Sequence, residues 1–269
     1  MIRLVGAFIK KKMASFFGFS SRLAPYVYWG ISVTCFLLQL IIQVSSGMMG
    51  MQLQSEFQLD ATSLSLLLCM VFIPNICLQI PAGMITDRFG ARKVLSVGAL
   101  VCAVGAWGFS NAHDFRAACF FRVIMGSGLA FAFVAMAYSL ANWMSRDSFS
   151  KMFCIAEMVA LGCTALAMKY LSVYLQTASW RGFVTMIMYA ALSLSVLAAV
   201  VIKDRPEYLD KSHSPLGFAD IWVHLRGFLA DSKMWANGVY SGLLFANLSC
   251  FVAQWSPGFL THAKTIDAM

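Results

Sequence analysis

The chain of 269 residues is strongly apolar, with 60% hydrophobic and 12% charged residues and a mean hydropathy of +0.74. A soluble fold of this length could not bury so much apolar surface, so a soluble globular protein is excluded. The composition therefore predicts an all-α, polytopic membrane protein. The net charge of +8 lies in clusters between apolar segments, and we expect no nucleic-acid partner.

The elements follow in a simple order. Residues 1–26 are a basic lead-in, in which three consecutive lysines interrupt any apolar core of a signal peptide. A membrane helix needs about 20 mostly apolar residues. Seven stretches qualify: 27–50, 62–85, 94–111, 117–143, 152–174, 182–202 and 234–260. The predicted domains are thus the lead-in 1–26, a six-helix bundle 27–202, a charged linker with an amphipathic helix 203–233, and a seventh span with a truncated C-terminus 234–269.

The basic residues predict the orientation. Most of the 20 lysines and arginines fall in 1–26, 86–93, 144–151 and 203–233. The positive-inside rule places these segments and the N-terminus in the cytoplasm, and we expect the protein in the cytoplasmic (inner) membrane. Seven-helix receptors have an external N-terminus, so this orientation argues against that class.

The loop between the second and third spans, LQIPAGMITDRFGARK, carries charge between two apolar helices. The pattern G-x-x-x-D-R-x-G with following basic residues resembles the corresponding loop of major facilitator superfamily transporters. A positive-inside hairpin alone would not explain the glycine–aspartate–glycine spacing. The residues on this gating-loop motif are Gly83, Asp87, Arg88, Gly90 and Arg92.

The residue types in this motif each have a physical reason. Gly83 should let another helix approach closely, and Gly90 allows the positive φ of a sharp reversal. Asp87 can cap an adjacent helix.

Further segments strengthen the resemblance. RVIMGSG at 122–128, SWRGF at 179–183 and KDRPE at 203–207 are similar to the family's fourth helix and to the two ends of its sixth helix. The resemblance implies a six-helix bundle with a 3 + 3 inverted repeat, followed by the first helix of the second half. Gly162 stands without the proline of the antiporter pattern, which weighs against a drug–proton antiporter.

Polar residues within the spans are candidates for a solute pathway: Gln39, Gln43, Asn75 and Arg122. A guanidinium at membrane depth costs at least about 2.5 kcal/mol unless compensated, so Arg122 should face the bundle interior, with Gln43 at similar depth and Gln39 one turn deeper. One interpretation is that the planar guanidinium of Arg122 recognises an anionic group of the solute through two hydrogen bonds. The other is that Arg122 orders the first and fourth helices whatever the solute. For Asn75, the alternative to a role in the solute pathway is an interhelical hydrogen bond.

Glu157 is the carboxylate clearly within membrane depth. It is a proton-coupling candidate, because such a group can carry a proton across apolar surroundings. The alternative is a structural partner for Asn142 or Arg146.

The resemblance implies secondary active or facilitative transport of a small polar solute by alternating access, with an anionic solute and symport with a proton or ion as open alternatives. We expect an incomplete transporter as it stands, with the lipid bilayer and a second half or another copy of the chain as partners. A truncated or regulatory membrane protein without transport is the rival hypothesis. Eight isolated cysteines and the absence of nucleotide-binding or hydrolase motifs predict no metal, no cofactor and no catalytic residue.

Overall fold

The computed structural model describes residues 23–204 and 230–246, and within them all regular elements are helices. Most of the predicted lead-in, residues 205–229 of the linker and residues 247–269 lie outside the described residues. The described helices are α2 Ala24–Met48, α3 Gly50–Phe57, α4 Ala61–Cys69, α5 Phe72–Ser110, α6 Phe115–Leu129, α7 Ala132–Trp143, α8 Arg146–Thr177, α9 Trp180–Val201 and α11 Ser232–Ala246.

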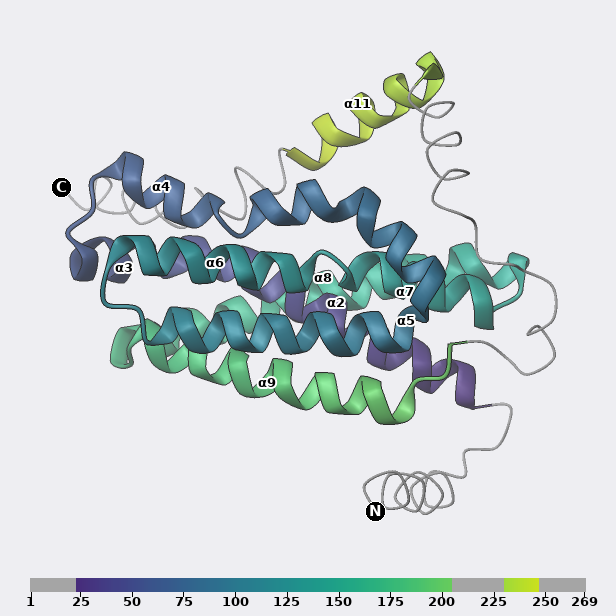
Figure 1. Cartoon of the computed structure of the whole chain (residues 1–269), viewed down its shortest axis with the longest axis horizontal. Coiled ribbons are helices and arrows are strands. Elements are labelled where there is room, and N and C mark those ends of the chain that lie inside the picture. The colour runs from purple at the N-terminus through teal and green to yellow at the C-terminus, as the bar shows by residue number, and fades with distance from the viewer. Residues whose placement is uncertain (1–22, 205–229, 247–269) are drawn as a thin grey trace.

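Six membrane crossings form the bundle. Among the described residues, five helical stretches are long and apolar enough to cross a membrane: Ala24–Met48, Ala61–Ser110, Phe115–Trp143, Arg146–Thr177 and Trp180–Val201. The second is 50 residues long and doubles back within α5, so it makes two crossings (Figure 1). The predicted six-helix order is therefore confirmed. We refer to the six crossings as spans 1 to 6. Of the predicted seventh span, the structure describes α11, whose described side chains are exposed.

The reversal within α5 occurs at Gly90, where φ is 80° and ψ is 158°. This left-handed region strongly favours glycine, because a side chain there would be strained. A Cβ at Gly90 would also lie 2.3 Å from Cγ of Asp204. The prediction for Gly90 is confirmed. A Cβ added at Gly83 would meet nothing within 4 Å in the described part of the chain, so the close approach of another helix stays a prediction.

Span 2 is interrupted between α4 and α5. Pro74 lacks the N–H that would bond the carbonyl of Met70, and its ring crowds the preceding turn. Consequently α4 ends at Cys69 and α5 begins at Phe72. Pro81, further along, lies inside α5 without ending it.

Span 5 is longer than predicted. Residues 144–151 were expected to be a loop, but α8 begins at Arg146. Ser145 stands at the N-cap with extended backbone, and Asp147 lies in the first turn, where a negative charge favours the positive end of a helix.

Spans 3 and 4 cross with their backbones in contact. A Cβ at Gly128 would lie 2.4 Å from the carbonyl oxygen of Gly98, and one at Gly105 would lie 2.5 Å from the amide nitrogen of Met125. A Cβ at Gly126 would lie 2.2 Å from the carbonyl oxygen of Val71. Gly126 and Gly128 thus let α6 pack closely against span 2 and span 3, respectively.

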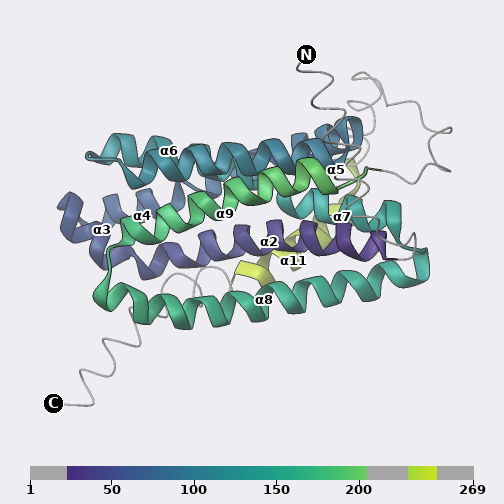
Figure 2. The ribbon, with the colours of Figure 1, turned by 90° about the horizontal axis from the view of Figure 1, so that it is seen from below.

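Two apolar clusters hold the bundle. The larger contains described residues of α2 to α7 and of α9, and the smaller contains described residues of α2, α7 and α8. In Figure 2, α8 lies at one side of the bundle beside α2. The buried side of α8 is a narrow stripe that includes Ala156, Ala160 and Thr164, and most of its remaining surface is exposed.

Candidate functional site

Arg122 is the centre of the candidate site. It lies on α6, about 10 Å from the start of that helix at 1.5 Å per residue, and its side chain is fully buried. Its Nη1 donates a hydrogen bond to Oγ of Ser46 at 2.9 Å, and its Cζ lies 4.7 Å from the ring centroid of Phe109. The guanidinium is thus held between α2 and α5, and the prediction that it faces the bundle interior is confirmed.

The guanidinium keeps unused donors. Its Nε and Nη2 are buried and find no hydrogen-bond partner among the described residues. Leaving the donors of a buried cation unpaired costs free energy, because water no longer satisfies them. The arrangement can therefore accept a further group that offers oxygen acceptors.

Two other predicted site residues also have a buried polar atom without a hydrogen-bond partner among the described residues. Gln39 is 5% exposed and its Oε1 has no partner in residues 23–204 and 230–246. Asn75 is 7% exposed, and its Oδ1 accepts from Nε2 of Gln79 at 3.4 Å while its Nδ2 is unpaired within the same ranges. One acceptor and one donor thus remain buried and unused, besides those of Arg122.

Gln39 and Gln43 lie on α2, the helix whose Ser46 accepts a hydrogen bond from Arg122. Gln39, Gln43 and Ser46 follow each other at spacings of four and three, so they share one face of α2. Gln43 is half-buried. Ser46, which sequence reasoning missed, is the residue that binds Arg122; its position one turn after Gln43 was the available signal.

Asn75 lies near the start of α5, directly after Pro74. A Cβ added at Gly126, one turn beyond Arg122 on α6, would lie 2.7 Å from Cγ of Pro74, the neighbour of Asn75. The start of α5 therefore packs directly on the helix that carries Arg122.

Glu157 lies apart from this group. It is half-buried on α8, between Ala156 and Ala160, which pack against the smaller apolar cluster. In the described part of the chain it forms no hydrogen bond or ion pair with Asn142 or Arg146, and Nδ2 of Asn142 donates to the carbonyl of Tyr138 at 2.9 Å. The structural-partner alternative is not observed.

The motif loop is tied to the end of span 6. The backbone N–H of Arg92 donates to Oδ1 of Asp204 at 2.6 Å, and Nε of Arg92 donates to the carbonyl of Ala199 at 2.7 Å. Asp204 thus caps the helix that starts after Gly90. Asp87 and Arg88 are exposed.

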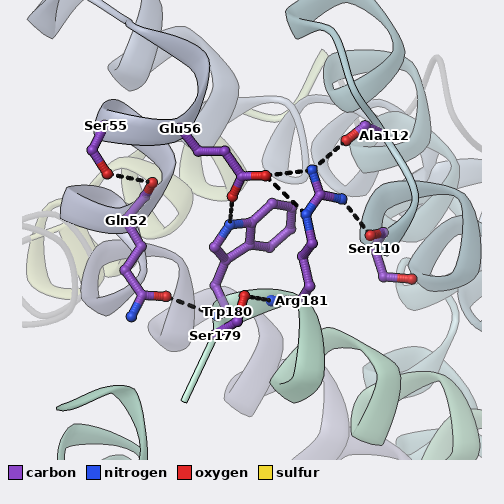
Figure 3. A network of polar contacts seen from close by, with 8 residues as sticks. All are labelled: Gln52, Ser55, Glu56, Ser110, Ala112, Ser179, Trp180 and Arg181. Carbon is purple, nitrogen blue, oxygen red and sulfur yellow. Dashed lines mark hydrogen bonds and ion pairs between the residues drawn. The ribbon is translucent and has the colours of Figure 1, made fainter. Parts of the chain in front are cut away.

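A polar network closes the opposite end of the bundle (Figure 3). Oε1 of Glu56 accepts from Nε and Nη2 of Arg181 at 2.9 and 2.6 Å, and Oε2 accepts from Nε1 of Trp180. Arg181 also donates to the carbonyls of Ser110 and Ala112. The network joins the ends of spans 1, 3 and 6.

The same network affects the titration of Glu56. Burial alone would raise the pKa of this carboxyl, but the hydrogen bonds from Trp180 and Arg181 and the charge of Arg181 lower the pKa below its usual value. The W-R motif pointed to Trp180 and Arg181 but not to Glu56. A lone carboxylate after an apolar span was the available signal.

These features define a multi-pass helical membrane protein with buried polar groups inside the bundle. The model of the Major Facilitator Superfamily matches residues 31–266, and the chain belongs to this family of transporters. A D-xylose transporter from Levilactobacillus brevis is 26% identical over 129 residues, which are 47% of this chain and 28% of that protein.

Solved structures show the same fold. A bacterial homologue of the human lysosomal transporter Spinster, in an inward-facing and unoccupied conformation, matches with a TM-score of 0.65 at 15% identity over 87% of this chain and 56% of that one. The inward-open xylose transporter XylE from E. coli matches with a TM-score of 0.60 at 15% identity over 81% and 56%. The chain spans less than two thirds of the length of these relatives.

Proposed function

We propose that the chain takes part in secondary transport of a small anionic solute by alternating access, in symport with a proton or another ion. The observation that carries this proposal is the guanidinium of Arg122, which is fully buried at membrane depth with Nε and Nη2 unpaired in the described residues. A carboxylate or phosphate can accept from a guanidinium through two parallel hydrogen bonds.

Neighbouring groups complete the proposed site. Nδ2 of Asn75 supplies a further donor and Oε1 of Gln39 an acceptor, so a solute with an anionic group and a hydroxyl would satisfy both. Gln43 lies on the same face of α2 and lines the pathway in this proposal. A sugar has no anionic group, so D-xylose serves as the comparison solute.

The motif loop and the membrane orientation belong to the same proposal. We place the N-terminus and the Gly90 end of the bundle in the cytoplasm, because the basic residues concentrate there. The loop from Gly83 to Arg92 would act as a gating element through its contacts with Asp204. Glu157 would carry the coupled proton, and a second half or another copy of the chain would complete the pathway.

Equilibrium binding tests the recognition step. Purified chain in lipid nanodiscs would be titrated with labelled lactate, inorganic phosphate and D-xylose. We expect saturable binding of at least one anion and a weaker affinity in Arg122→Lys, because lysine keeps the charge but loses the planar fork. Arg116→Lys is the matched control, since Arg116 lies on the same helix with an exposed side chain.

Two results would contradict the proposal. Equal anion affinity in wild type and Arg122→Lys would make Arg122 a structural residue. Absence of binding by the wild type, with no uptake in liposomes with or without a proton gradient, would favour a regulatory membrane protein.

A further inference from the structure

Four side chains form one continuous column from the bundle interior to its surface. Cζ of Arg122 lies 4.7 Å from the ring centroid of Phe109, the ring centroids of Phe109 and Trp180 are 4.9 Å apart, and Cζ of Arg181 lies 4.6 Å from the Trp180 ring. Arg122 and Phe109 are completely buried and Trp180 is 1% exposed. The column connects the buried guanidinium with the ion pair of Glu56 and Arg181.

The contact with Phe109 restricts Arg122. The hydrogen bond to Oγ of Ser46 fixes one nitrogen but leaves the guanidinium plane free to rotate about that bond. A cation over an aromatic face is attracted by the negative charge density of the ring. The Phe109 ring therefore supplies the second contact that defines the plane.

The far end of the column is anchored. Nε1 of Trp180 donates to Glu56, and the backbone N–H of Trp180 donates to Oε1 of Gln52 at 2.7 Å. Arg181, whose guanidinium lies over the Trp180 ring, is itself held by Glu56 and by two backbone carbonyls (Figure 3). Phe109 thus rests against a tryptophan whose position is set by several hydrogen bonds.

The Phe109–Trp180 pair has a favourable geometry. The two ring planes are tilted by 46°, and aromatic pairs prefer such offset or tilted arrangements over a face-to-face sandwich. A shift of Trp180 would therefore displace Phe109, and with it the ring face that Arg122 uses.

We infer that Phe109 and Trp180 are positioning residues for Arg122. They hold its guanidinium in one orientation, so that Nε and Nη2 present their donors to the proposed solute site, and Glu56 with Arg181 keeps Trp180 in place. The inference rests on the proposed function only for the role of Arg122 in recognition. The geometry of the column stands independently of that role.

The Nε–H signal of Arg122 in NMR spectra of ¹⁵N-arginine-labelled protein in deuterated micelles tests the inference directly. Arg122→Lys assigns the signal by its disappearance. We expect the ring current of Phe109 to displace the signal in the wild type. In Phe109→Leu it should move toward the position of an exposed arginine and broaden.

Controls separate positioning from general packing. Phe36→Leu removes another buried ring, which packs against Phe133 at 5.4 Å in the other apolar cluster, and it should leave the Arg122 signal in place. Phe109→Tyr keeps the ring and should retain the displaced signal. Glu56→Gln should shift the signals of both Arg181 and Arg122.

The result that overturns the inference is an Arg122 signal that is the same in Phe109→Leu as in the wild type. If Phe109→Leu does not fold, Glu56→Gln decides: a changed Arg181 signal with an unchanged Arg122 signal would show that the column does not act on Arg122.

Binding of labelled lactate and phosphate adds a functional measurement. Phe109→Leu should raise the dissociation constant about 2- to 30-fold without changing the number of sites, because cation–π contacts contribute about 0.5–2 kcal/mol. Absence of binding in the wild type would contradict the proposed function but not the NMR result. Unchanged affinity in Phe109→Leu, with clear binding by the wild type, would contradict the positioning role.

Discussion

Asp204 and Arg92, which are 112 residues apart in the chain, close the ends of each other's helices. Asp204 accepts from the backbone N–H of Arg92 in the first turn after Gly90, where N–H groups lack partners within the helix. Arg92 in return donates to the carbonyl of Ala199, one of the last four of α9, which lack partners for the same reason. One pair thus caps two spans.

Removing this carboxylate should destabilise the bundle. We expect Asp204→Ala to lower the free energy of unfolding by about 1 kcal/mol, as for other lost N-caps, and Asp204→Asn to lose less because an acceptor oxygen remains. Reversible unfolding in mixed micelles measures both. A wild-type stability in Asp204→Ala would show that the cap contributes nothing to stability.

The crossing of spans 3 and 4 should not tolerate a methyl group. Gly128→Ala would place Cβ 2.4 Å from the carbonyl oxygen of Gly98, and we expect a loss of about 1–3 kcal/mol. Gly162→Ala is the matched control, because a Cβ there meets nothing within 4 Å and alanine favours a helix interior by about 0.5–1 kcal/mol. Equal stability of the two variants would contradict the direct backbone contact.

The Glu56–Arg181 pair should weaken in acid. Hydrogen bonds and the Arg181 charge lower the pKa of Glu56 from its usual 4.5 in the folded protein, so the stabilisation is present above that pH and is lost as the pH falls through the folded pKa. Glu56 lies on α3, outside the apolar helix Ala24–Met48.

The measurement is the unfolding midpoint as a function of pH. As the pH falls below the usual carboxyl pKa of 4.5, the wild type should lose more stability than Glu56→Gln, whose side chain does not titrate. Parallel curves for the two proteins would show that the pair does not contribute to acid sensitivity.

Glu157 provides a test of coupling. We expect Glu157→Gln to bind the solute with unchanged affinity but to lose the proton exchange that accompanies binding, because glutamine cannot ionise. The measurement is the pH change of a weakly buffered sample on addition of the bound anion. Asp147→Asn, which removes an exposed carboxylate in the first turn of the same helix, is the control. Equal proton exchange in wild type and Glu157→Gln would show that another group carries the coupled proton.

Local features were predictable from the sequence. Apolar length predicted the six crossings, and glycine chemistry predicted the reversal at Gly90. Hydrogen-bond partners that lie far apart in the chain could not be predicted from the sequence. Ser46 lies 76 residues from Arg122, and Glu56 lies 125 residues from Arg181. Such pairs depend on how the spans are arranged around each other, which hydropathy and positive-inside charge do not specify.

Spans 3 and 6 are joined along their full length. Ser96 and Ser195 exchange hydrogen bonds between side chain and carbonyl at 3.0 and 2.7 Å, about one helical turn from the Asp204 cap and several turns from the Arg181 network. Two helices fixed at three levels form a rigid frame, so any rearrangement within the bundle has to displace other helices against this pair. A covalent cross-link between cysteines at positions 96 and 195 should accordingly leave solute binding intact.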